Sequence, residues 1–180
     1  DIAVISLSGA VTWKSIRTAG DEMNKNIVQY AKDHFNLLVG ERYAEELKMK
    51  IGSAVPLAEP MECALRGRDL VTGLPREIII NDEQVRAALS RSVRAMIDSI
   101  KSVLEITPPE LVADIHERGI VLSGGGSLLA GLDKAMAEAT DIPVRIADDP
   151  ITCVVRGTGI LLERPDLLET VGLPSSGSLR

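Results

Sequence analysis

The sequence of 180 residues is 45% hydrophobic and only 2% aromatic, which predicts one large domain or two small lobes around an aliphatic core. A net charge of −6 with so few aromatic side chains argues against a nucleic-acid-binding surface, and no apolar run approaches the roughly 20 residues of a membrane helix. The two cysteines, Cys63 and Cys153, and the two histidines argue against a zinc site and a disulfide scaffold, so we expect a cytoplasmic location.

The N-terminal residues predict a β-hairpin. Apolar stretches at 2–7 and 10–17 flank a turn at Ser8-Gly9, as expected for two antiparallel strands. The first strand starts at once, without an initiator Met. We therefore expect the chain to be a fragment of a longer protein.

Two helices and a second hairpin are expected next. Asp21 is placed to cap a helix that continues to about residue 39 and is closed by Gly40. A charged helix is expected at 41–51, and strands are expected at 62–69 and 76–80, on either side of a Thr-Gly turn.

The following segment predicts a long helix and a short one. An apolar residue recurs every three or four positions from residue 82 to 104, after a capping Asn81. A Pro-Pro pair at 108–109 then ends this helix and begins another that reaches about residue 117.

The most informative stretch is the apolar run 120–122 followed by Ser123 and the three glycines 124–126. This pattern predicts a strand that ends in a tight turn, with a helix starting immediately and continuing to about residue 140. Glycine lets a ligand lie directly on the backbone, and the free N–H groups at a helix start favour an electron-rich partner. The turn therefore suits a nucleotide, although many α/β proteins use such turns for geometry alone.

The C-terminal segment predicts a strand at 144–147 and a helix from Pro150 through Glu163. Its expected packed face consists of Cys153, Val154, Gly157, Ile160 and Leu161. We attribute Gly157 and Gly159 to close packing of this helix on the sheet. The tail from residue 164 to 180 is rich in Pro, Ser and Gly, and we expect poor order at its end.

In this order and spacing, several segments together resemble the second half of the bacterial actin homologues of the MreB family, which belong to the superfamily of actin, sugar kinases and DnaK-type chaperones. The resemblance extends to about residue 163. The segments that carry it are Ala3 to Gly9, Ala19-Gly20-Asp21-Glu22-Met23, Gly40-Glu41-Arg42, Ala44-Glu45-Glu46-Leu47-Lys48, Thr72-Gly73-Leu74-Pro75-Arg76, Thr107 to Leu111, Glu117-Arg118-Gly119, Leu122 to Leu129, Asp149-Pro150 and Arg156-Gly157-Thr158-Gly159.

The resemblance implies an α/β fold, in which an RNase-H-like, actin-like lobe carries a smaller α+β insert. Residues 1–22 and 82–180 would form subdomain IIA, and residues 23–81 would form the inserted subdomain IIB. The parent protein would be an ATPase of two domains that forms filaments at the inner face of the cell membrane. Such filaments guide cell-wall synthesis and determine rod shape.

The resemblance also assigns the adenosine half of the ATP site to this chain. Gly124, Gly125, Gly126 and Ser127 match the adenosine loop. Glu45, Glu46, Leu47 and Lys48 match a nucleotide-contacting helix, where residues three apart share one side, so that Glu45 and Lys48 can face the nucleotide. Hydrogen bonds to the ribose and a contact with base or phosphate are their implied roles. Without the resemblance, a solvated helix face with i,i+4 pairs is the favoured explanation of these charges.

The resemblance places the phosphate loops, the residues that position the attacking water and the membrane-binding element outside this chain. We therefore expect no catalytic residue and no metal ligand here, with Mg²⁺ bound mainly through the phosphates of ATP. Expected partners are other filament subunits, a membrane-anchored adaptor and the cell-wall elongation machinery. Two alternatives stay open: half of a sugar kinase or chaperone ATPase, and an actin-like lobe that docks partners without nucleotide.

Overall fold

The computed structural model describes residues 1–7, 9–164 and 166–167, so the expectation of a poorly ordered C-terminal tail lies almost entirely outside the described residues. The elements in chain order are β1 (Ile2–Ser6), β2 (Gly9–Lys14), α1 (Gly20–Phe35), β3 (Leu37–Leu38), α2 (Glu41–Ile51), β4 (Glu62–Asp69), β5 (Pro75–Asn81), α3 (Asp82–Glu105), α4 (Pro109–Arg118), β6 (Ile120–Leu122), the 3₁₀ helix η1 (Gly125–Leu128), α5 (Leu132–Thr140), β7 (Val144–Ile146) and α6 (Cys153–Glu163).

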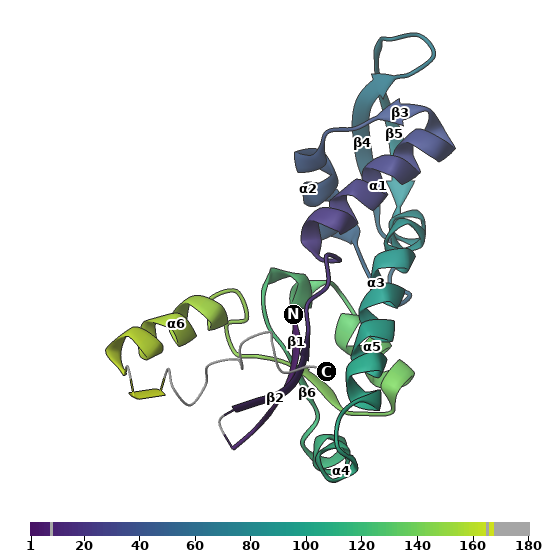
Figure 1. The fold of residues 1–180 in the computed structure, drawn as a ribbon. Helices are drawn as coiled ribbons and strands as arrows, with labels where there is room; N and C mark the ends of the chain where they lie inside the picture. Colours follow the sequence, from purple (N-terminus) through teal and green to yellow (C-terminus); the bar gives the residue numbers. More distant parts are fainter. Residues whose placement is uncertain (8, 165, 168–180) are drawn as a thin grey trace.

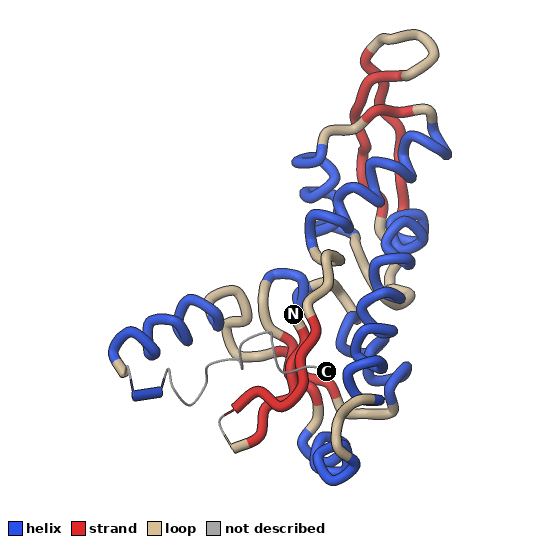
Figure 2. The backbone as a smooth tube through the Cα atoms, viewed as in Figure 1, coloured by secondary structure: helices blue, strands red, loops and turns tan. Residues whose placement is uncertain are grey.

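The described strands form three small sheets. β1 and β2 make the predicted antiparallel hairpin, with an irregularity in register after Val4. The second sheet has the antiparallel order β3-β4-β5, and β6 pairs with β7 in parallel. The β3–β5 sheet lies at one end of the elongated molecule, while the other two lie toward the opposite end (Figures 1 and 2). The predicted turn residue Ser8 lies outside the described residues.

The prediction of one helix from Asp21 to about residue 39 was wrong at both ends. The helix begins at Gly20 after the N-cap residue Ala19, and Asp21 lies in its first turn without capping it. It ends at Phe35 because Asn36 adopts the left-handed conformation, with φ of 51°, which asparagine tolerates better than most residues. The chain then forms the short strand β3, and Gly40 is the N-cap of α2 rather than the end of α1.

Helix α3 confirms the predicted cap. The side chain of Asn81 accepts a hydrogen bond from the backbone N–H of Gln84, and the Gln84 side chain accepts one from the N–H of Asn81. This reciprocal pair satisfies two N–H groups that have no partner within the helix. A strong start fixes α3 at the end of β5, so the long helix can join both ends of the molecule (Figure 1).

The core is aliphatic, as predicted. One cluster of buried side chains joins α1, α2 and the β3–β5 sheet to α3 and α5. Its largest members that are almost completely buried are Met23, Ile27, Leu37, Leu47, Leu65, Ile80, Val85 and Leu89. Packing is therefore continuous across residue 81, where we expect the subdomain boundary, and the division into 1–22 with 82–180 and 23–81 stays a prediction.

Helix α6 does not have the packed face that we expected. Val154 and Ile160 are 69% and 55% exposed, and no described residue of α6 is buried. A Cβ added to Gly157 or Gly159 would meet no atom within 4 Å, so close packing does not explain these glycines. The ribbon shows α6 projecting away from the rest of the chain (Figure 1). An apolar periodicity predicts a buried face only where a partner surface is present.

Within the described residues, none of the helices combines the length and the apolar character needed to cross a membrane.

Candidate functional site

The glycine turn follows the predicted strand, but it does not open a long helix. Gly124 has a φ of 82°, and its N–H donates to the carbonyl of Pro150 at 2.7 Å. One 3₁₀ turn, η1, comes next, and the chain then leaves the helical path at Leu129. The helix α5 starts only at Leu132, after Gly131 with a φ of 71°. The prediction of a continuous helix to residue 140 was wrong, because two left-handed glycines enclose a separate short turn.

The three glycines differ in what the fold requires of them. Gly124 needs glycine because its φ is positive. Gly125 and Gly126 have no positive φ, and a Cβ added to either would meet nothing within 4 Å. Neither backbone strain nor internal packing therefore accounts for glycine at these two positions. The turn presents a bare, open stretch of backbone.

Ser127 stabilises this turn from within. It is 4% exposed, and its Oγ donates to the carbonyl of Gly124 at 2.7 Å. A hydroxyl engaged in this way holds the three glycines in one conformation. The structure thus assigns Ser127 a structural contact inside the turn.

The four predicted residues of α2 point in different directions. Leu47 is 1% exposed and belongs to the core, so its side chain cannot contact a ligand. Glu46 lies 3.5 Å from Arg42, one helical turn earlier, as expected for a solvated i,i+4 pair. Glu45 is exposed. Of the two acidic residues, Glu45 is thus the one that has no ion pair among the described residues.

Lys48 ties α2 to the start of α1. Its Nζ donates to Asn24 Oδ1 at 2.8 Å and to the carbonyl of Gly20 at 3.2 Å. Burial lowers the pKa of Lys48, while the nearby charges of Glu45 and Asp21 act in the opposite direction. The amine is therefore a half-buried cation held by two oxygen acceptors.

A short junction brings α2 beside the glycine turn. The N–H of Ala54 donates to the carbonyl of Ala130 at 2.8 Å, and Ser53 pairs with Ala130 as in a parallel sheet. A Cβ on Gly52 would lie 3.2 Å from the Leu129 side chain. The residues directly after α2 therefore contact those directly after η1. This contact brings together the ends of the two segments that the resemblance assigns to one site.

Sequence reasoning missed two parts of this arrangement. Asn24 is buried and accepts a hydrogen bond from Lys48, but from the sequence we assigned it no role beyond its place in a helix. Gly52 directly follows the predicted helix at 41–51, and the sequence does not indicate its contact with Leu129. A buried Asn at helical spacing from core residues is a signal that a polar partner must be nearby, and it could have identified Asn24.

Comparison with known proteins decides the family. The profile of the MreB/Mbl protein family matches residues 1–170. The chain belongs to the MreB/Mbl family. It is 48% identical over 168 residues to the cell shape-determining protein Mbl of Bacillus subtilis (strain 168), covering 93% of this chain and 50% of the relative. Over 167 residues it is 44% identical to the cell shape-determining protein MreB of Escherichia coli (strain K12), covering 93% and 48%. The chain thus spans about half the length of these curated relatives.

Solved structures of other proteins share the fold. MreB5 of Spiroplasma citri bound to AMPPNP is 35% identical, with a TM-score of 0.88 over 95% of this chain and 51% of that chain. The same protein bound to ADP gives a TM-score of 0.84 over 89% and 48%. A MamK double helical filament, at 22% identity, matches with a TM-score of 0.68 over 83% and 46%. The expected actin-like α/β fold is confirmed.

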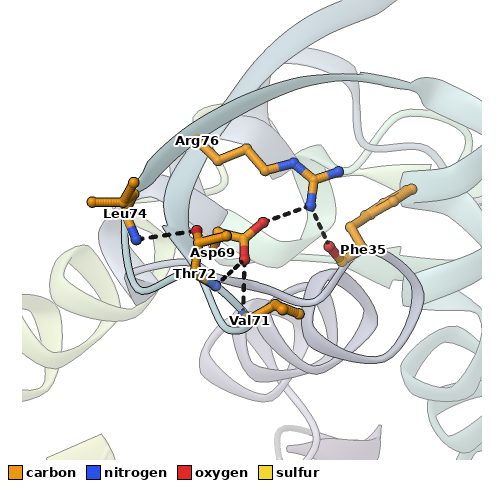
Figure 3. Close-up of polar contacts among 6 residues, drawn as sticks. All are labelled: Phe35, Asp69, Val71, Thr72, Leu74 and Arg76. Carbon is orange, nitrogen blue, oxygen red and sulfur yellow. Dashed lines mark hydrogen bonds and ion pairs between the residues drawn. The ribbon is translucent and has the colours of Figure 1, made fainter.

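This MreB/Mbl chain also carries a hydrogen-bonded hairpin tip between β4 and β5. The Asp69 carboxylate accepts hydrogen bonds from the backbone N–H groups of Thr72 and Val71, both at 2.8 Å, and from Arg76 Nη1 at 2.9 Å (Figure 3). Arg76 also donates to the carbonyl of Phe35 at 3.2 Å. These hydrogen bonds lower the pKa of Asp69 from the ordinary 3.8 to about 2. The backbone donors of Thr72 and Val71 have the largest effect, followed by Arg76.

The acid stability of the tip should depend on Asp69. The pKa of Asp69 is lower in the folded chain than in the unfolded chain. The carboxylate therefore stabilises the fold fully above pH 3.8, and this contribution is lost as the pH falls toward about 2. Asp69→Asn should lower stability at neutral pH and remove much of the loss between 3.8 and about 2. Thermal unfolding at stepped pH checks this, with the exposed Asp98→Asn as control. An acid dependence unchanged by Asp69→Asn would refute it.

Proposed function

We propose that this chain is the second domain of an MreB-type actin-like ATPase and that it forms the adenosine-binding half of the ATP site. The observation that carries the proposal is the bare backbone at Gly125 and Gly126, where neither φ nor packing requires glycine. A ligand that lies against the backbone explains both positions. The solved structures of MreB5, which contain ADP or AMPPNP, support adenosine as the ligand.

In this proposal the nucleotide lies between the glycine turn and the exposed side of α2. Glu45 is free to accept hydrogen bonds from the ribose hydroxyls. Lys48 can contact the base or a phosphate if its hydrogen bond to Asn24 is replaced by one to the ligand. If that bond persists, Lys48 instead holds α2 in position, so that the neighbouring Glu45 faces the ligand. Ser127 supports the turn, and Leu47 anchors the helix.

Lys48→Ala should weaken nucleotide binding several-fold in the full-length protein. A charged hydrogen bond of this kind contributes on the order of 1 kcal/mol when it is partly exposed. Isothermal titration with an ATP analogue measures the change, and Lys50→Ala, an exposed lysine of the same helix, is the matched control. If both variants bind the ATP analogue as tightly as the unmodified protein does, Lys48 has only a structural role.

Hydrolysis of ATP in this proposal requires residues outside the chain. We assign no Mg²⁺ ligand and no catalytic residue to this chain, because the family resemblance places these groups in the other domain. The sequence of the gene upstream of Asp1 tests the domain assignment. It should encode a glycine-rich Asp-x-Gly-Gly-Gly-Thr-type loop preceded by a whole first domain. A start codon close to Asp1 would contradict the assignment.

We also propose that the parent protein forms filaments through the β4–β5 hairpin of this chain, among other contacts. The tip exposes three apolar side chains, Leu70, Val71 and Leu74, the second of them 81% exposed. The hydrogen bonds of Asp69 hold this apolar tip in one conformation, which lowers the entropic cost of a contact. The proposed partner of this tip is a second copy of the protein, as expected for a filament-forming family. A membrane-anchored adaptor and the cell-wall elongation machinery at the inner face of the membrane are further proposed partners of the parent protein.

Val71→Asp should impair filament assembly without affecting the fold. Placing a charge in a desolvated contact is costly, so the critical concentration for assembly should rise at least about tenfold, which corresponds to about 1.4 kcal/mol. Sedimentation of the full-length protein with ATP measures it. Ile106→Asp, at another exposed apolar position, is the control. Equal assembly of the Val71→Asp variant would exclude the tip as a contact.

A further inference from the structure

A hollow lies on α3, and the residues of the glycine turn are not part of it. Its walls come from α3, from the start of the connection after α2, and from α5, which packs beside α3 (Figure 1). The hollow has a volume of about 350 Å³. This volume lies at the lower end of the range for small-molecule sites and is too small to take a helix of a partner protein.

The walls of the hollow are mainly apolar. Val93 and Ile97 come from α3, Ala54 comes from the junction, and Ala139 comes from α5. Ile97 and Ala139 are only partly buried, so apolar surface remains available to a ligand. Such a surface favours an alkyl chain or a comparable apolar body.

Ser53 adds a polar group without a partner to this wall. The residue is completely buried, and its Oγ makes no hydrogen bond with any described residue. A buried hydroxyl in this state is unfavourable, and it is normally paired with protein, water or ligand. An acceptor atom bound in the hollow would supply the missing partner.

The charges around the hollow favour an anion. Arg86 is neutralised by Asp82 at 3.1 Å. Arg94 is exposed, lines the hollow and has no ion pair among the described residues. Asp98 lies one turn further along α3 and lines an adjoining hollow together with Arg91. Within the part of the chain described, Asp98 makes no ion pair with Arg94. The guanidinium of Arg94 is therefore available to a carboxylate.

We propose that this hollow binds a small monocarboxylate with an unbranched apolar chain. The chain lies against Val93, Ile97 and Ala139, and the carboxylate pairs with Arg94 and accepts a hydrogen bond from the Ser53 hydroxyl. The inference does not rest on the proposed nucleotide site, because none of the residues assigned to that site lines the hollow.

Titration of the full 180-residue chain with sodium decanoate, followed by amide NMR, tests the proposal. Saturable shifts should occur at Ala54, Val93 and Ala139. Decanol should bind several-fold more weakly, and acetate should cause no saturable shift, because the site needs both the chain and the charge. Equal binding of decanol and decanoate would reduce the site to an apolar hollow and overturn the proposal, as would the absence of saturable shifts.

Two variants make the test specific. Arg94→Ala should weaken decanoate binding about tenfold and leave decanol binding unchanged, since a charged hydrogen bond is lost. Lys101→Ala removes an exposed cation of the same helix and should change neither. Ala139→Leu should fill the hollow and abolish binding of both ligands. Equal weakening by Arg94→Ala and Lys101→Ala would show nonspecific charge attraction and would contradict the proposal.

Discussion

Gly125→Val should abolish nucleotide binding in the full-length protein and leave its fold intact. A Cβ at this position meets no protein atom within 4 Å and the φ of Gly125 is not positive, so neither the backbone nor the space around the Cβ opposes a side chain here. The added side chain instead occupies the space where the adenosine should lie. We expect the dissociation constant for an ATP analogue to rise at least ~100-fold, which corresponds to about 2.7 kcal/mol.

Isothermal titration and thermal unfolding of the same preparation separate binding from folding. Gly157→Val is a suitable control, because Gly157 also has open space around it but lies on α6. Unchanged affinity of the Gly125→Val variant would remove the glycine turn from the nucleotide site. Loss of the fold in this variant would show that Gly125 has a structural role.

Gly52→Ala should destabilise the chain and separate α2 from the glycine turn. Its Cβ would lie 2.3 Å from the carbonyl oxygen of Lys48 and 3.2 Å from the Leu129 side chain. The carbonyl belongs to the backbone and cannot move without disturbing the end of α2. We expect the free energy of unfolding to fall by about 1–3 kcal/mol, as for other overpacked sites.

Gly40→Ala is the matched control for this junction. Gly40 and Gly52 flank the same helix, both have an extended backbone, and a Cβ on Gly40 would meet nothing within 4 Å. Urea unfolding of both variants compares the two ends of α2. Equal stability of Gly40→Ala and Gly52→Ala would show that the contact between Gly52 and Leu129 does not hold the two segments together.

Local sequence signals predicted most elements of the fold. The helix at 41–51 and the strand at 62–69 have the predicted bounds, and α3 has the predicted cap at Asn81. The end of α1 was missed because Asn36 leaves the helical conformation without proline or glycine. The break before α5 was missed because the positive φ of Gly131 is not visible in the sequence. The exposed face of α6 was missed for another reason, because hydrophobic periodicity does not show whether a partner surface is present.

The candidate site was predictable as two segments but not as a geometry. The glycine pattern and the charged helix are visible in the sequence, whereas the junction of Ser53 with Ala130 depends on backbone pairing between distant residues. The partner of Lys48 was only partly visible, since the helical spacing of Asn24 from core residues indicates a buried polar side chain but not the cation that it binds. Open space above Gly125 is likewise a property of the folded chain alone.

A crystal structure of the full-length protein with AMPPNP would show directly whether the glycine turn binds the nucleotide. We expect the adenosine against the backbone of Gly124 to Gly126, with its ribose near Glu45 and with the junction of Ser53 and Ala130 intact. A nucleotide bound elsewhere, with Gly125 and Glu45 still facing solvent, would contradict it.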